Sequence, residues 1–313
     1  MKLALVLCMG LSLCALLASC QPRAELHIAF HPWVGYETLS LAEEFQWLPD
    51  NVVLHRFPSS QGSMEALLAG DVQAAALTLD EALRLRDKLP RLAIVLVMNE
   101  SAGADVILGG EGVASVGDLK GARVAYQPDS VSEYLLRMAL DTEGLSIDDV
   151  ISVELPPGNQ VQAFRRGDID AVVTYPPMAD DLIALGARGI FDSGETSNTI
   201  FDVLAVDRRG LVNRQEILSQ VTAAHFEVLK YLDRSLEDTV YRFAEYQQTN
   251  AAAVRETLTK IRLPDLPAVR GLLAPGGAIA RTSEALLKAG IVPVASEDLR
   301  DTIDGRYLPR GPR

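Results

Sequence analysis

Cysteine is scarce in this 313-residue chain, and all of it lies near the N-terminus. The three cysteines are Cys8, Cys14 and Cys20, so the chain after residue 20 contains none. The main body therefore can form no disulfide, no thiolate nucleophile and no metal site built on sulfur.

Motifs of the common catalytic and metal-binding classes are also missing. The chain has four histidines, which are His27, His31, His55 and His225. None stands in an HExxH or other spaced metal pattern, and there is no GxSxG nucleophile turn and no Walker-type phosphate loop. We therefore predict no catalytic residue, no metal and no cofactor, and we expect a protein that is not an enzyme.

Basic residues are in the minority, with 42 acidic side chains against 29 basic ones and a formal net charge of −13. This balance argues against binding to nucleic acid or to an anionic membrane surface. No apolar run after residue 20 approaches the length of a membrane span. Nearly half of the residues are hydrophobic, which is enough for one large or two medium cores.

The first residues are typical of an export signal. Lys2 is followed by an apolar run, then by small residues and Cys20, in the sequence "MKLALVLCMGLSLCALLASC". The end of this stretch, Leu17-Ala18-Ser19-Cys20, resembles the bacterial lipobox, which implies cleavage before Cys20 and lipidation of that residue. An ordinary cleavage site next to an unmodified cysteine is the alternative. We predict a signal peptide at 1–19, a lipidated tether at 20–25, and a location in the bacterial cell envelope on the periplasmic side, anchored to the inner or outer membrane.

Apolar strands and amphipathic helices alternate through most of the chain. Strands are expected at 26–30, 52–57, the run after Gly70, and 91–99, and a second alternating set follows a glycine-rich break at 109–121. From about residue 211 the pattern changes to amphipathic helices without strands. Such alternation predicts an α/β fold with two doubly wound, mostly parallel sheets, and a helical C-terminal segment.

One phrase occurs twice, as "GDVQAAALTLDE" from Gly70 and as "GDIDAVVTYPP" from Gly167. In each copy the glycine is expected to end a helix and the apolar run to form a strand, with Thr78 and Thr174 near the strand ends. Ligands bind outside the carboxyl ends of strands in open α/β sheets. Two such strand ends that face each other predict a ligand cleft.

Several stretches resemble the substrate-binding proteins of ABC importers in the nitrate, sulfonate, taurine and thiamine-precursor group. They are "WVGYETLSLAEE" (33–44), "GSMEALLAGDVQAAALTLDEAL" (62–83), "ESAGADVIL" (100–108), "VGDLKGARVAY" (116–126), "SVSEYLLRMAL" (130–140), "FRRGDIDAVVTYPP" (164–177), "ARGIFDS" (187–193) and "DVLAVD" (202–207). The resemblance implies a type II periplasmic-binding-protein fold that closes on a small molecule by hinge motion, with an ABC permease and ATPase as partners. It implies lobe I from 26–109 and 208–313, lobe II from 110–207, and we expect a monomer.

The candidate ligand-binding residues follow strand ends or begin helices. They are Trp33, Tyr36, Ser60, Gln61, Thr78, Asp80, Asn99, Ser101, Asp105, Ser130, Ser132, Glu133, Thr174 and Tyr175. Loop packing is the alternative for Trp33, and pairing with the helix dipole is the alternative for Glu81, which leaves Asp80 as the better contact candidate. Ser63 is expected to cap its helix.

The expected rim is short of basic residues and contains aromatic and acidic ones. We therefore favour a ligand that bears an amine or is a neutral nitrogenous compound over an oxyanion. A sensory binding protein that signals to a membrane receptor is an alternative function. An enzyme related to thiamine-pyrimidine synthases is a further alternative, although the chain lacks the "CCCGC"-like motif of that relative.

Overall fold

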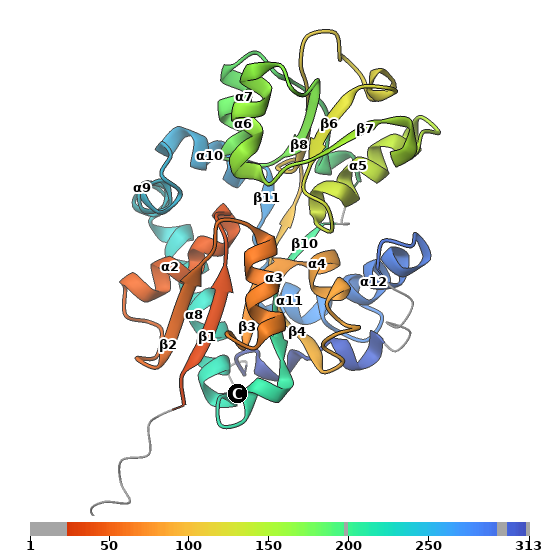
Figure 1. The fold of residues 1–313 in the computed structure, drawn as a ribbon. Coiled ribbons are helices and arrows are strands. Elements are labelled where there is room, and N and C mark those ends of the chain that lie inside the picture. The colour runs from red at the N-terminus through yellow and green to blue at the C-terminus, as the bar shows by residue number, and fades with distance from the viewer. Residues whose placement is uncertain (1–23, 197–199, 293–298, 311–313) are drawn as a thin grey trace, which may run out of the picture.

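Two β-sheets, each covered by helices, form the protein in a computed structural model that describes residues 24–196, 200–292 and 299–310 (Figure 1). The predicted signal peptide at 1–19 and the lipidation site Cys20 lie outside the described residues. The predicted α/β class with two sheets is confirmed.

The first sheet has the strand order β11-β4-β10-β3-β1-β2. Its strands are β1 (Leu26–Phe30), β2 (Val52–Arg56), β3 (Ala74–Thr78), β4 (Leu92–Ser101), β10 (Phe201–Asp207) and β11 (Ile261–Arg262). β1 pairs in parallel with β2 and β3, whereas β10 is antiparallel to both β3 and β4, and β11 is antiparallel to β4. Every residue of β4 and β10 is buried, as a strand covered on both faces requires.

The second sheet has the order β7-β6-β8-β5-β9. Its strands are β5 (Val106–Gly109), β6 (Arg123–Tyr126), β7 (Ile151–Glu154), β8 (Ala171–Thr174) and β9 (Arg188–Asp192). β6 pairs in parallel with β7 and β8, and β5 is antiparallel to β8 and β9. Both sheets are thus mixed, because one strand in the interior of each runs against its neighbours, and the expectation of mostly parallel pairing needs this correction.

Two strands lie in a different sheet from the one that the expected lobe boundaries imply. β5 lies within the expected lobe I range 26–109 but pairs in the second sheet, and β10 lies within the expected lobe II range 110–207 but pairs in the first. The chain therefore passes from one sheet to the other between β4 and β5 and returns between β9 and β10. The glycine-rich stretch from residue 109 is a turn beside β5, where Gly110 N–H donates to the Asp170 carbonyl at 2.8 Å.

The helices before β4 pack on the first sheet, and those between β5 and β10 pack on the second. On the first sheet lie η1 (Val34–Tyr36), α2 (Glu37–Glu44), α3 (Ser60–Ala69) and α4 (Leu79–Arg84); on the second lie η2 (Val116–Leu119), α5 (Val131–Thr142), η3 (Ile147–Asp149), α6 (Pro157–Arg166) and α7 (Met178–Ala184), followed by η4 (Ser193–Thr196). The C-terminal helices are η5 (Arg208–Leu211), α8 (Gln215–Arg234), α9 (Leu236–Gln247), α10 (Ala251–Thr259), α11 (Leu266–Leu272), α12 (Ala278–Lys288), η7 (Leu299–Thr302) and η8 (Gly305–Tyr307).

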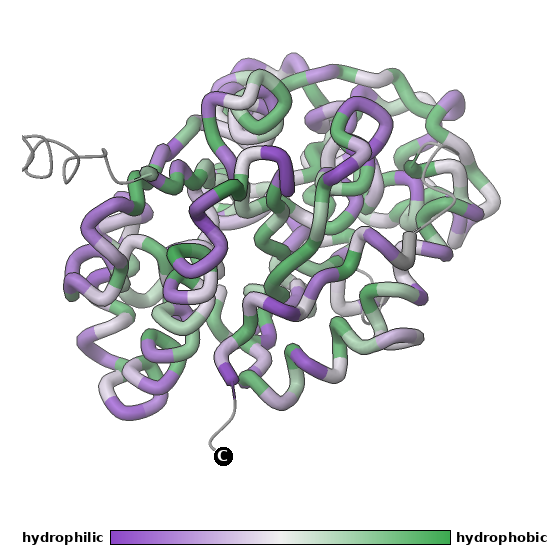
Figure 2. Tube along the Cα trace, turned by 90° about the horizontal axis from the view of Figure 1, so that it is seen from below, coloured by the Kyte–Doolittle hydropathy of each residue, from purple (hydrophilic) through white to green (hydrophobic). Residues whose placement is uncertain are grey.

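The C-terminal helices pack mainly on the first sheet, as the sequence predicts. α8 packs on α2, α12 on α4, and α11 on β4 (Figure 1). The Thr222 hydroxyl of α8 donates to the Tyr307 carbonyl at 2.5 Å, and Ile303 forms a bridge with Ile94 of β4. Seen from below, hydrophobic segments run through the centre and hydrophilic ones are frequent at the periphery (Figure 2).

Both copies of the repeated phrase are helix ends that lead into a strand, as predicted. Gly70 ends α3 with φ of 82° and Gly167 ends α6 with φ of 71°, a left-handed conformation that glycine adopts without a steric penalty. β3 and β8 follow. The prediction that Ser63 caps a helix is wrong, because α3 begins at Ser60 and Ser63 is buried inside it.

Candidate binding site between the two sheets

A small cavity lies between the two sheets. It is lined by His31, Trp33, Ser60, Thr78, Glu81, Asp105, Gln127, Ser130, Val131, Ser132, Tyr175 and Asp202. His31 follows β1, Thr78 ends β3, Gln127 follows β6 and Tyr175 follows β8, so the carboxyl ends of four strands meet there. This is the position at which open α/β sheets bind ligands.

Asp202 reaches the cavity from the other end of its strand. β10 is antiparallel to β3, and Asp202 pairs with Thr78 in the register. The first residues of β10 therefore lie at the edge where the parallel strands end.

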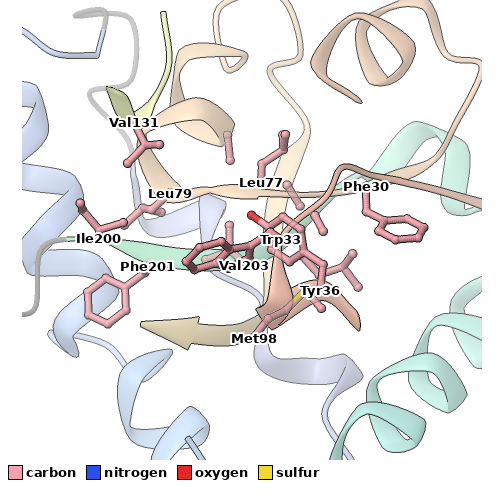
Figure 3. Close-up of a cluster of buried hydrophobic side chains, with 14 of the residues drawn as sticks. Phe30, Trp33, Tyr36, Leu77, Leu79, Met98, Val131, Ile200, Phe201 and Val203 are labelled. Atoms are coloured by element: carbon pink, nitrogen blue, oxygen red, sulfur yellow. The ribbon is translucent and has the colours of Figure 1, made fainter. Parts of the chain in front are cut away.

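Two aromatic side chains from opposite sheets meet at the cavity. The rings of Trp33 and Tyr175 have centroids 5.8 Å apart and an interplanar angle of 87°. Trp33 Nε1 donates to Asn99 Oδ1 at 3.2 Å, and Gly35 leaves room for this pair, since a Cβ there would lie 2.0 Å from Asn99 Nδ2. In Figure 3, Trp33 and Tyr36 lie in an apolar cluster with Phe201. Trp33 thus lines the cavity and packs in the core at once.

Three carboxyl groups line the cavity, on Glu81, Asp105 and Asp202. Burial raises the pKa of Asp105 to about 6, although a hydrogen bond with Ser101 opposes the rise. Burial also raises the pKa of Glu81, and it raises the pKa of Asp202 well above its usual range, with the charges of Asp105 and Glu81 adding to the latter effect. Burial removes water from these carboxyl groups, and no lysine or arginine among the described lining residues replaces it.

Each of these carboxyls is anchored in the fold. The Tyr36 hydroxyl donates to Asp202 Oδ1 at 2.5 Å, and the Thr78 backbone N–H donates to Glu81 Oε2 at 3.0 Å as part of a capping box at the start of α4. Burial raises the pKa of Tyr36, and the nearby Asp202 charge raises it further, so its hydroxyl is protonated and donates.

In the described part of the chain, no lysine or arginine lines this cavity. Two arginines outside the lining contact other carboxylates: Arg56 pairs with Glu37 at 2.7 Å, and Arg84 contacts Asp129 at 3.1 Å. Burial, followed by the Arg56 charge, lowers the pKa of His31 to about 3, so the imidazole is neutral near pH 7. His31 Nδ1 has no hydrogen-bond partner in the described structure.

Contacts between the sheets close the cavity. Gln127 Nε2 donates to Ser60 Oγ at 2.8 Å, and Arg84 of α4 reaches across to Asp129 and, at 3.9 Å, to Glu133. The parts of the protein built on the two sheets therefore contact each other around the cavity.

Half of the predicted site residues line the cavity. They are Trp33, Ser60, Thr78, Asp105, Ser130, Ser132 and Tyr175. Behind the lining lie five buried residues, which are Tyr36, Asp80, Asn99, Ser101 and Thr174. Asp80 accepts from the Thr78 hydroxyl at 2.8 Å and contacts Arg84 at 3.8 Å, while Ser101 Oγ lies 2.7 Å from Ser193 Oγ.

The remaining two predicted residues lie away from the lining. Gln61 donates to Glu65 at 2.9 Å on the surface of α3, and Glu133 accepts from Arg137 at 2.8 Å on α5. The preference for Asp80 over Glu81 is reversed in the structure, because the capping geometry of α4 brings Glu81 to the cavity and leaves Asp80 behind it.

Sequence reasoning missed five lining residues: His31, Glu81, Gln127, Val131 and Asp202. His31 and Gln127 directly follow strands, so the rule that selected Trp33 could have found them. Asp202 could not be found that way, because its strand runs in the opposite direction.

In the described part of the chain, no His, Cys, Asp and Glu side chains gather in a group of three or more that could hold a metal ion. None of the helices in that part combines the length and the apolar character that crossing a membrane takes.

Comparison with known proteins supplies relatives for this fold. Over 204 residues the chain is 29% identical to a putative aliphatic sulfonates-binding protein of Escherichia coli, and the match covers 63% of each protein. It is 26% identical over 127 residues to the taurine-binding periplasmic protein of E. coli, which covers 41% of this chain and 40% of that one. The chain thus spans less than two thirds of the length of these relatives.

The structure is similar to the alkanesulfonate-binding protein SsuA from Xanthomonas axonopodis pv. citri, solved with bound MOPS. The TM-score is 0.72 at 21% identity, covering 94% of this chain and all of that one, which shows a shared fold. A family described as NMT1-like matches residues 19–244. The chain belongs to the NMT1-like family.

Proposed function

We propose that this protein is an extracytoplasmic substrate-binding protein that captures a small molecule between its two sheets and delivers it to an ABC importer. One observation carries the proposal: a cavity at the carboxyl ends of strands whose lining comes from both sheets, with Trp33 and Ser60 from one and Tyr175 and Ser130 from the other. The relatives named for sulfonate and taurine binding support the same role.

In this proposal, the first sheet with the C-terminal helices is one lobe and the second sheet is the other. The lobes open and close about the two connections between the sheets, one between β4 and β5 and one between β9 and β10. Hinge closure is a common way to capture a ligand, and the contacts of Arg84 with Asp129 and Glu133 belong to the closed form.

We further propose that the chain is exported, lipidated on Cys20, and held on the periplasmic side of a bacterial membrane as a monomer, with a permease and an ATPase as partners. The lipobox-like ending and the relative named as periplasmic support this location. Replacement of Cys20 by Ser should abolish incorporation of a labelled fatty acid in cells. Undiminished labelling would contradict the anchor.

The binding role can be tested by native mass spectrometry of the full chain purified in detergent. We expect a small molecule to co-purify and to be released chemically unchanged. The variant Ser132→Trp, which fills the cavity, should lose it, and the exposed Glu65→Gln should retain it. Conversion of the bound molecule would favour an enzyme, since a fold by itself does not settle function.

A further inference from the structure

The three carboxyl groups of the cavity have no lysine or arginine beside them among the described residues of its lining. Glu81, Asp105 and Asp202 all line the cavity, and each of these residues is at least 94% buried. Arg56 pairs with Glu37 outside the lining, and Arg84 lies 3.8 Å from Asp80 behind it. Burial without a cation disfavours the charged form of these carboxyls, so a cationic ligand that entered the cavity would be stabilised by them as they ionise.

A second observation is independent of the carboxyls. His31 lines the cavity with 5% of its surface exposed, and its Nδ1 has no hydrogen-bond partner in the described structure. Buried polar atoms are nearly always satisfied, so an unpaired ring nitrogen beside a cavity indicates a ligand that supplies the bond. Because this imidazole is neutral, its unprotonated ring nitrogen can accept a hydrogen bond from an N–H or O–H of that ligand.

The aromatic walls favour the same chemistry. Trp33 and Tyr175 meet edge to face, one from each sheet, at the cavity that holds the three carboxyls. Aromatic faces attract cations, and the effect is largest when the site is closed to water. A sulfonate would find none of the arginine or lysine side chains that usually bind such a group.

We propose that this cavity binds a ligand with a positively charged ammonium group, which Glu81, Asp105 and Asp202 hold against the rings of Trp33 and Tyr175. The inference rests on the proposed binding function and specifies its ligand class. It separates this chain from relatives that are named for sulfonates.

Matched probe pairs test the charge preference by calorimetric titration of the full chain in detergent at pH 7.5. The pairs are ethanolamine with isethionate and benzylamine with benzenesulfonate, which carry an ammonium or a sulfonate group on closely similar frameworks. At least one ammonium probe should bind about 30-fold or more tightly than its sulfonate partner. Glu81→Gln should weaken that binding by about 30-fold or more, as loss of a buried charge partner does, while Glu65→Gln should leave it unchanged.

Asp105→Asn provides a second test, because Glu81 also caps α4 and its variant could fail to fold. Circular dichroism checks the fold of each variant, and weakened binding in a folded Asp105→Asn chain supports the inference. Tighter binding of a sulfonate, or no binding of either ammonium probe, overturns it. In both of these cases a co-purified molecule in native mass spectrometry would still support the binding function itself, so the two failures are distinguishable.

Discussion

The buried carboxyl of Asp105 should make the stability of the ligand-free protein depend on pH. Burial raises its pKa to about 6 from an ordinary 3.8. Because the folded form holds the proton more tightly than the unfolded form, this group destabilises the fold above pH 6. The cost is relieved as pH falls from 6 to 3.8. At about 1.4 kcal/mol for each pKa unit, the full cost is about 3 kcal/mol.

Replacing Asp105 with Asn removes this titration and keeps the size of the side chain. The variant should therefore have its largest advantage in free energy of unfolding at pH 7.5. That advantage should shrink by about 2 kcal/mol at pH 4.5, since roughly 1.5 of the pKa units lie between 4.5 and 6. Burial lowers the pKa of His31 and of His225 to about 3, but both histidines are present in either chain and cancel in the comparison.

The assay is urea unfolding of the ligand-free full chain at the two pH values, followed by circular dichroism. The exposed Glu65→Gln serves as control and should differ from the parent chain by the same amount at both pH values. A difference between Asp105→Asn and the parent chain that does not change with pH would refute the claim that Asp105 is buried without a compensating cation.

Two further predictions concern packing and closure. Gly35→Ala should lower the free energy of unfolding by about 1–3 kcal/mol, because its Cβ would lie 2.0 Å from Asn99 Nδ2. The control Gly158→Ala, which meets nothing within 4 Å, should be neutral or stabilise by at most about 1 kcal/mol, and equal effects in urea unfolding would contradict this. Arg84→Gln removes the contacts with Asp129 and Glu133, worth about 1 kcal/mol, and should weaken binding of a co-purified ligand about fivefold by calorimetry. Unchanged affinity would mean that these ion pairs do not stabilise the closed form.

Local sequence patterns predicted most helices and strands of this fold, because the start and end of such an element depend mainly on residues close to it in the sequence. The periodicity around α2 and the glycine after α3 are examples, and Gly70 adopts the expected left-handed conformation. The sheet to which each strand belongs was harder to predict from the sequence. β5 and β10 are short apolar strands, and nothing within them indicates whether their ladder partners lie nearby or a hundred residues away.

The site was predictable only where strand direction is uniform. Thr78 is the last residue of β3 and Tyr175 follows β8; both strands end at the cavity, and both residues were predicted. Asp202 was missed because β10 runs the other way. The choice between Asp80 and Glu81 depended on the rotation of the first turn of α4, which a capping hydrogen bond sets and which composition does not reveal.

The central place of β10 in the first sheet has a consequence for the order of folding. β10 lies between β3 and β4, yet the whole second sheet, 106–192, separates it from them along the chain. Every pairing within the second sheet uses residues from that one continuous stretch. Closing its loops therefore costs less conformational entropy than bringing β10 to β3 and β4. We expect the second sheet and its helices to fold early. The first sheet should be completed last, when β10 inserts between β3 and β4, which precede it by about a hundred residues in the sequence.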